Sequence, residues 1–184
     1  RPTPTRQQAA AVAVPDTKIP DTISAEHPLR VVIAGAGVGG LTLANALKGC
    51  DHVDVQLIEK TSAFKRFGGP IQLASNAMRQ LQELNPALYD EVAAQATWTG
   101  NRTNGIKDGV RDEWYAKFDL KTPAEVRGMP FTCVIDRPDL QATLLSRVGH
   151  AVSNSKRVES YAPDGANGDG VALTLVGGEV RRGD

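Results

Sequence analysis

Three apolar segments near the start of the chain show the patterns of a strand, a helix and a strand in turn. Residues 29–34 (LRVVIA) form a short, β-branched, almost uncharged run, which is typical of a parallel strand buried on both faces. Residues 41–47 carry apolar positions at helical spacing, and residues 53–58 (VDVQLI) read as a second strand. A strand, a helix and a strand in this order predict a βαβ unit with parallel strands.

The next patterned region predicts two consecutive helices. Ser75 can cap the first of them, whose apolar face comprises Met78, Leu81 and Leu84. Asn85-Pro86 ends this helix, and a second helical pattern runs through Val92.

Strand signals dominate much of the remaining sequence. Residues 97–118 combine aromatic and β-branched residues with Asn and Gly turn signals, which predicts antiparallel strands of a second sheet. Residues 131–135 read as a strand, and Asp136 then precedes a helix with one apolar stripe of Leu140, Leu144, Leu145 and Val148. Near the end, alternating VALTLV, the pair Gly177-Gly178 and EVRR predict a hairpin.

Residues 1–28 lack a sustained helical or strand period and contain five prolines. We expect a flexible leader there, and two interpretations of it stay open. Its Ser, Thr, Ala and Arg content suits the remnant of an organelle transit peptide, whereas Asp16, Asp21 and Glu26 favour a plain linker.

Composition narrows the class of partner. The 184 residues are 41% hydrophobic, and 21 basic residues balance 21 acidic ones, so a soluble globular protein is expected, with no nucleic-acid partner and with a small-molecule ligand instead. Cys50 and Cys133 are isolated, as are the three histidines, so we predict no metal site and no disulfide framework. Every apolar stretch is shorter than the ~18 residues of a membrane span.

The glycine-rich turn between the first strand and its helix carries the candidate chemistry. Residues 35–40 (GAGVGG) match G-x-G-x-x-G in the strand–turn–helix context that makes this motif informative. We expect Gly35 to permit the sharp turn, Gly37 to let a pyrophosphate approach the backbone, and Gly40 to allow close packing of helix on strand. Amides at the helix start would bind the phosphate charge.

Glu59 follows the second strand, 19 residues after Gly40. A dinucleotide-binding fold presents a carboxylate to the ribose hydroxyls of adenosine at this position. An acid there favours FAD or NAD over NADP, whose 2′-phosphate it would repel, but it does not separate FAD from NAD. The alternatives to this reading are a generic glycine turn and a solvated strand end.

Three further stretches favour FAD. They are FGGPIQLASNAMRQL at 67–81, TGNRTNGIKDGVRDEWYAKFD at 99–119 and VIDRPDLQATLL at 134–145. With the glycine motif, they resemble the zeaxanthin epoxidases, within the larger group of single-component, aromatic-hydroxylase-like flavin monooxygenases. The resemblance extends over residues 29–184.

The resemblance implies an α/β fold in which a Rossmann-type FAD-binding domain is interleaved with a β-sheet substrate domain. Residues 29–184 would then be an incomplete FAD-binding domain, with residues 97–130 starting the substrate sheet. Arg137 and Gln141 match an arginine and a glutamine that this group places against FAD, and i and i+4 share a helix face. Arg137 could instead pair with a neighbouring aspartate. The resemblance also places a basic residue, Lys65 or Arg66, near the cofactor, and Arg66 is the candidate.

The implied activity is an epoxidation that the flavin carries. The resemblance implies that FAD is reduced by electrons from NADPH, directly or through reduced ferredoxin. The reduced FAD would react with molecular oxygen to give a flavin hydroperoxide. This would transfer one oxygen atom to a xanthophyll carotenoid, converting zeaxanthin to violaxanthin via antheraxanthin. No catalytic acid–base residue is expected. The resemblance implies carotenoid biosynthesis and the xanthophyll cycle in the chloroplast, with peripheral contact to the thylakoid membrane.

Two later motifs of that group, A-D-G and G-D-x-x-H, do not occur in the sequence. Gly168-Asp169 is no substitute, because it reads as a loop turn. The missing motifs lead us to expect a part of a longer flavoprotein that is truncated at its C-terminus and inactive alone, and the start at Arg1 rather than Met also indicates an incomplete chain.

Other functions stay open at this point. The chain could belong to another FAD-dependent monooxygenase of the aromatic-hydroxylase type. It could also belong to an NAD-dependent dehydrogenase, but the sequence of a dehydrogenase should continue with more βα units.

Overall fold

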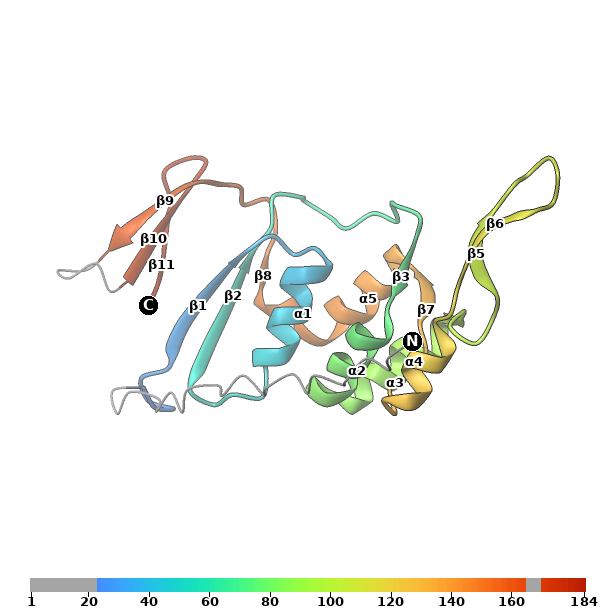
Figure 1. The fold of residues 1–184 in the computed structure, drawn as a ribbon. Coiled ribbons are helices and arrows are strands. Elements are labelled where there is room, and N and C mark those ends of the chain that lie inside the picture. The colour runs from blue at the N-terminus through green and yellow to red at the C-terminus, as the bar shows by residue number, and fades with distance from the viewer. Residues whose placement is uncertain (1–22, 165–169) are drawn as a thin grey trace, which may run out of the picture.

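A computed structural model describes residues 23–164 and 170–184, so residues 1–22 of the predicted leader (1–28) and the turn at Gly168-Asp169 lie outside the described residues. Its central element is a parallel sheet of order β1-β2-β8 (Figure 1), formed by β1 (Leu29–Ala34), β2 (Val53–Ile58) and β8 (Val152–Ser153). β1 and β2 pair along their whole length, from Leu29↔Val53 to Ala34↔Ile58. The predicted βαβ unit is therefore present.

Two helices pack together on one side of this sheet (Figure 1): α1 (Val38–Leu47) and α5 (Arg137–Val148). A 3-10 turn, η1 (Gly149–Ala151), joins α5 to β8. The predicted stripe of α5 is confirmed, since Leu140, Leu144 and Val148 are buried and the half-buried Leu145 packs against the same core. They share one hydrophobic core with Ile33 and Leu57 of the sheet and with the buried faces of the other helices.

An antiparallel sheet of order β11-β10-β9 lies on the other side of β1 from α1 (Figure 1). Its strands are β9 (Val158–Asp164), β10 (Gly170–Leu175) and β11 (Val180–Gly183). The predicted hairpin is its β10–β11 pair, turning at Gly177 and Gly178 with φ of 100° and 85°. The Asp184 amide donates to the carbonyl of Arg30, 3.0 Å away, so the end of β11 lies against β1.

The middle of the chain forms a second small sheet and its helices. β3 (Pro70–Leu73) and β4 (Thr97–Trp98) both pair antiparallel with β7 (Cys133–Asp136). Two adjacent helices follow β3 as predicted, α2 (Ser75–Leu84) and α3 (Pro86–Gln95).

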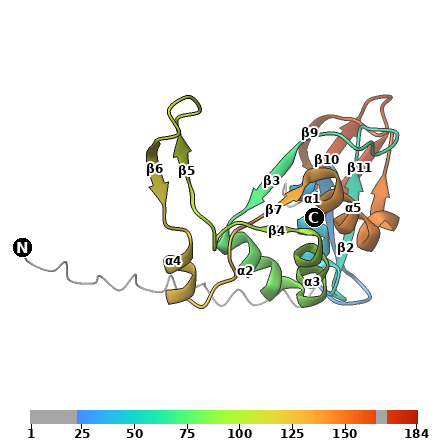
Figure 2. The same cartoon turned by 90° about the vertical axis from the view of Figure 1, so that its right-hand side faces the viewer.

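The predicted antiparallel strands between residues 97 and 118 include a separate hairpin. β5 (Asn104–Lys107) and β6 (Trp114–Phe118) pair only with each other among the described strands and extend away from the helices, as both views show (Figures 1 and 2). The short helix α4 (Lys121–Val126) leads from this hairpin back toward β7.

Two local predictions are wrong. Ser75 does not cap α2: the helix begins at Ser75 itself, Ala74 holds the cap position, and the Ser75 hydroxyl lies 3.4 Å from that of Thr132. Leu84 does not share the buried face of Met78 and Leu81, since it is 52% exposed at the last position of α2.

Candidate functional site

The glycine turn at the end of β1 is shaped by backbone crowding. Gly35 has φ of 102°, a conformation that a side chain disfavours. At Gly40 a Cβ atom would lie 2.0 Å from the Gly35 carbonyl oxygen and 3.1 Å from Cγ2 of Ile33. The expected sharp turn and close helix-on-strand packing are thus both present.

Gly37 has no such internal reason to be glycine. No atom lies within 4 Å of the place where its Cβ would be, so the space beside it is open. Gly37 is also the N-cap of α1, where no side chain caps the helix and no acidic residue occupies the first turn. Because a helix start offers unpaired amides and a partial positive charge, this end of α1 can accept an anionic group.

Glu59 directly follows β2 and is only 8% exposed. One carboxylate oxygen accepts a hydrogen bond from the backbone amide of Ala36, inside the glycine turn, at 2.8 Å. The other accepts from the amide of Thr61, also at 2.8 Å. A carboxylate has about four lone-pair sites, so these two bonds leave capacity for hydroxyl donors.

Hydrogen bonds keep Glu59 ionised despite its burial. Burial of the carboxyl group acts to raise its pKa, but the hydrogen bonds from Thr61 and Ala36 outweigh burial and lower the pKa below the ordinary value of 4.5. The side chain is therefore a carboxylate at neutral pH.

The head of α5 faces the glycine turn. The side-chain amide of Gln141 donates to the Ala36 carbonyl at 3.1 Å, although the two residues are 105 positions apart in sequence. Arg137 makes no ion pair with a neighbouring aspartate among the described residues, and its side chain packs against Gly68, where a Cβ would lie 3.2 Å from Cδ of Arg137. The arginine remains available to a ligand.

These groups meet in one pocket of about 290 Å³. Its lining includes Ala36, Gly37, Glu59, Thr61, Phe64, Lys65, Phe67, Arg137 and Gln141. The pocket thus combines an uncapped helix start, a carboxylate and a free guanidinium, a set that suits a ligand with phosphate and ribose hydroxyl groups.

Arg66 is placed differently from the other predicted site residues. Its guanidinium forms an ion pair with Asp139, in the first turn of α5, at 2.6 Å. It lines a neighbouring apolar pocket of about 250 Å³ with Pro138 and Leu145, not the pocket that contains Gly37. Arg66 therefore does not line the pocket at the glycine turn in this structure.

Sequence reasoning missed three contributors to the site. Thr61 binds Glu59 through its backbone, which leaves no signature in residue type. Phe64 packs against the core, whereas Phe67 is 82% exposed at the pocket. The sequence offered one signal for Phe67: it is an aromatic residue directly before the pair Gly68-Gly69.

Other parts of the structure offer less to a dinucleotide. A larger pocket of about 460 Å³ runs along β2 near its start, lined by Leu47, Val53 and His150 among others, but it contains neither the glycine turn nor Glu59.

The described residues hold no group of three or more potential metal ligands. None of their helices is both long and apolar enough to cross a lipid bilayer.

No protein-family model matches the chain. Solved structures do resemble it. HpxO of Klebsiella pneumoniae, in a variant complexed with FAD, superposes with a TM-score of 0.69 at 25% identity over 85% of this chain and 38% of HpxO. The tetrameric form of 2-methyl-3-hydroxypyridine-5-carboxylic acid oxygenase gives a TM-score of 0.65 at 28% identity over the same shares. The chain therefore has the fold of the FAD-dependent monooxygenases.

Curated relatives narrow this class. The chain is 40% identical to the chloroplastic zeaxanthin epoxidase of Spinacia oleracea over 96% of its own length, and 38% identical to that of Prunus armeniaca over 95%. The predicted resemblance is confirmed, and the chain is a homologue of the zeaxanthin epoxidases. It spans 27% of the length of each of these two relatives.

Proposed function

We propose that this chain is the FAD-binding part of a flavin monooxygenase that epoxidises a xanthophyll carotenoid. The observation that carries the proposal is the coincidence of two findings. The chain is homologous to zeaxanthin epoxidases over nearly its full length, and a pocket at its glycine turn joins a helix start with Glu59 and Arg137.

The chain's own residues would divide the work of holding FAD. Gly37 and the start of α1 would receive the pyrophosphate, and Glu59 would accept hydrogen bonds from ribose hydroxyls. Arg137 would neutralise negative charge beside Gly37, and Gln141 would fix the Ala36 carbonyl. Once bound, the flavin supplies the oxidation chemistry, while the protein orients it and excludes water.

The substrate and electron source follow from homology alone. The relatives' name assigns zeaxanthin to them, and we extend a carotenoid substrate, with molecular oxygen, to the protein that contains this chain. NADPH or reduced ferredoxin would supply the electrons. Because the relatives are named chloroplastic and a carotenoid dissolves in lipid, we place the protein in the chloroplast, in peripheral contact with the thylakoid membrane.

A second candidate is a flavin monooxygenase acting on an aromatic or heterocyclic substrate. HpxO has been solved with FAD and uric acid, and it shares the fold of this chain at 25% identity. The higher identity to zeaxanthin epoxidases, 40%, favours the carotenoid.

An NAD-dependent dehydrogenase is disfavoured by topology. Such a protein should continue its parallel sheet with further βα units, whereas here an antiparallel sheet, β9–β11, follows β8.

The flavin spectrum of the purified full-length protein tests cofactor binding. We expect FAD absorbance in the parent and its loss in Gly37→Glu, because the new carboxylate would fill the open space beside the helix start. Gly49→Glu is the matched control: it adds the same charge near the other end of α1, where a Cβ also meets no atom within 4 Å. A colourless parent that binds NADH would overturn the proposal in favour of a dehydrogenase.

The substrate is tested separately on flavin-loaded protein. Conversion of zeaxanthin to its epoxides is the expected result. Hydroxylation of an aromatic acid without any carotenoid product would support the second candidate.

A further inference from the structure

Asn45 is a polar residue in the middle of α1 that the cofactor pocket does not use. Its side chain is buried, with 5% of the residue exposed, at the contact between α1 and α5. Burying a polar side chain between two helices costs free energy unless it forms hydrogen bonds. The hydrogen bonds of Asn45 therefore indicate its role.

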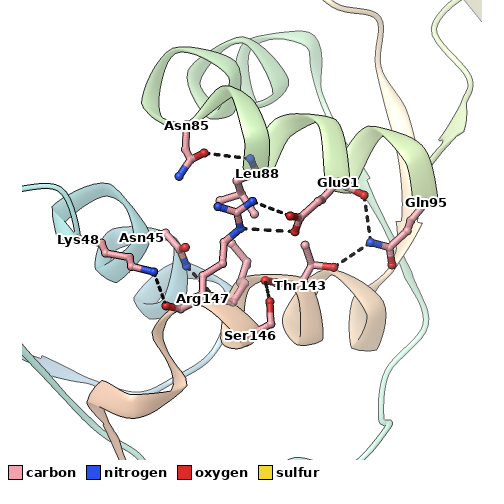
Figure 3. Close-up of polar contacts among 10 residues, drawn as sticks. Asn45, Lys48, Asn85, Leu88, Glu91, Gln95, Thr143, Ser146 and Arg147 are labelled. Carbon is pink, nitrogen blue, oxygen red and sulfur yellow. Dashed lines mark hydrogen bonds and ion pairs between the residues drawn. The ribbon is translucent and has the colours of Figure 1, made fainter.

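Both protons of the Asn45 side-chain amide are engaged. One bond goes to the carbonyl of Leu41, one turn earlier in α1, at 2.8 Å. The other crosses to α5 and reaches the carbonyl of Leu144 at 2.9 Å. Figure 3 shows Asn45 directed from α1 toward α5, between Lys48 and Arg147.

Two more bonds from a side chain to a backbone carbonyl join α5 to the segments at the two ends of α1. At the cofactor end, Gln141 of α5 donates to the carbonyl of Ala36, in the glycine turn before α1, at 3.1 Å. At the far end, Lys48, the C-cap of α1, donates to the Arg147 carbonyl at 2.8 Å. Asn45 lies between these two along the interface, and it is the buried member of the set, since Lys48 is exposed.

The opposite side of α5 is held by α3, as Figure 3 also shows. Arg147 pairs with Glu91 at 2.7 Å, and Gln95 donates to the Thr143 hydroxyl at 2.9 Å. These contacts, like those of Lys48, attach to the second half of α5. Its first turn carries Arg137, so the position of that arginine depends on how the helix is seated.

We propose that Asn45 is a positioning residue for the cofactor site: it fixes the axial position of α5 on α1, so that Arg137 and Gln141 meet the glycine turn. Its bond to Leu144 specifies one register, because an apolar contact alone permits the helix to slide, whereas a hydrogen bond is directional. The inference rests on the proposed binding of FAD at the glycine turn.

If Asn45 acts by positioning α5, its replacement should change the affinity for FAD without lowering the stability of the protein. Leucine resembles asparagine in shape, and it removes the side-chain oxygen of Asn45, which is buried without a hydrogen-bond partner among the described residues. Asn45→Leu should therefore leave the free energy of unfolding unchanged or higher, because the cost of burying that oxygen disappears. It also removes the directional bond. We therefore expect it to weaken FAD binding about five- to tenfold, which corresponds to one lost hydrogen bond.

The test measures FAD dissociation constants by flavin fluorescence, and urea unfolding, on full-length apoprotein reconstituted with FAD. Asn45→Ala serves as a second variant, because it cannot introduce a clash if the leucine does not fold. Thr42→Val is the matched control: its hydroxyl bonds only within α1, to the Val38 carbonyl at 2.7 Å, so FAD affinity should be retained.

A double-mutant cycle decides how Asn45 acts. In a Gln141→Ala background the effect of Asn45→Leu on FAD affinity should shrink to less than about twofold, because coupled residues are non-additive. An undiminished effect in that background, unchanged affinity in Asn45→Leu, or an affinity loss that only follows lost stability would each overturn the inference. A parent that binds no FAD would instead overturn the proposed function.

Discussion

At the scale of single residues, Glu59 is both a ligand candidate and an internal support. Its two oxygens hold the amides of Ala36 and Thr61, so the carboxylate connects β2 to the turn after β1. A glutamine in its place has only one acceptor oxygen and would turn an amide N–H toward one of these donors.

Glu59→Gln should therefore lower the free energy of unfolding by about 1–3 kcal/mol at pH 7, since a hydrogen bond to a charged group is lost. Because folding lowers the pKa of Glu59 from 4.5, its contribution is complete above that pH and is lost as the pH falls through the folded-state pKa. Urea titrations from pH 7 to 3 should show this loss in the parent and a smaller one in the variant. Equal pH profiles would contradict the assignment.

Glu113→Gln is the control for that series, because its exposed side chain has no hydrogen bond or ion pair among the described residues.

Gly40 offers a second test at this scale. Gly40→Ala would place a methyl group 2.0 Å from the Gly35 carbonyl oxygen, and we expect a destabilisation of about 2–3 kcal/mol from overpacking. Gly39→Ala, where a Cβ meets no atom within 4 Å, should be neutral or stabilising, because alanine favours a helix. Thermal unfolding of the pair measures the difference, and similar losses in both would refute the close-contact explanation.

At the scale of elements, the start of α3 depends on Asn85. Its side-chain oxygen accepts from the Leu88 amide at 3.0 Å, and Pro86 occupies the first helical turn. We expect Asn85→Ala to cost about 1 kcal/mol in urea unfolding, as for other lost N-caps. Ser75→Ala should cost clearly less, because Ser75 caps no helix; a larger loss at Ser75 would reverse this reading.

The contrast between Asn85 and Ser75 shows where sequence reasoning succeeds. Asn85 precedes a proline, which both ends α2 and begins α3, so the local signal and the structure agree. At Ser75 the preceding Ala74 leaves β3 in an extended conformation and takes the cap position, which depends on the pairing of β3 with β7. Such pairing across some 60 residues leaves no local pattern.

The residues of the candidate site also fall into those that local sequence predicts and those that it does not. The glycine turn and Glu59 follow from spacing within one βαβ unit, and the structure brings them together. Arg137 and Gln141 were placed by family resemblance, and no periodicity reveals that Gln141 reaches Ala36. Arg66 was also placed by the resemblance, yet its guanidinium pairs with an acidic side chain at the start of α5, which only the folded chain brings beside it.

At the scale of the whole molecule, the β5–β6 hairpin extends away from the helices, as both views show (Figures 1 and 2). It pairs with no other described strand, and Ile106, Trp114, Tyr115 and Phe118 are all exposed. The Nζ atoms of Lys107 and Lys117 lie 5.3 and 5.4 Å from the centroid of the Trp114 ring. A lone two-stranded ribbon is marginally stable in water.

Hydrogen exchange of the 184-residue chain should therefore show two levels of protection. Amides of the β1–β2 ladder should exchange through global unfolding, whereas those of β5–β6 should exchange faster by at least about a hundredfold, through local opening. Mass spectrometry of peptic fragments resolves both segments. Equal protection would mean that the hairpin is stabilised by contacts beyond its own two strands.

The bond between Gln141 and Ala36 also has a consequence for synthesis in the cell. The glycine turn leaves the ribosome early, but its partner on α5 follows 105 residues later, which at about 5–20 residues per second is a delay of roughly 5–20 seconds. During that interval the turn and Glu59 can meet, while the opposite wall of the pocket does not yet exist. A nascent chain would therefore acquire high affinity for its nucleotide in a single late step, when α5 docks, and a chain stalled before that point would be a poor cofactor binder.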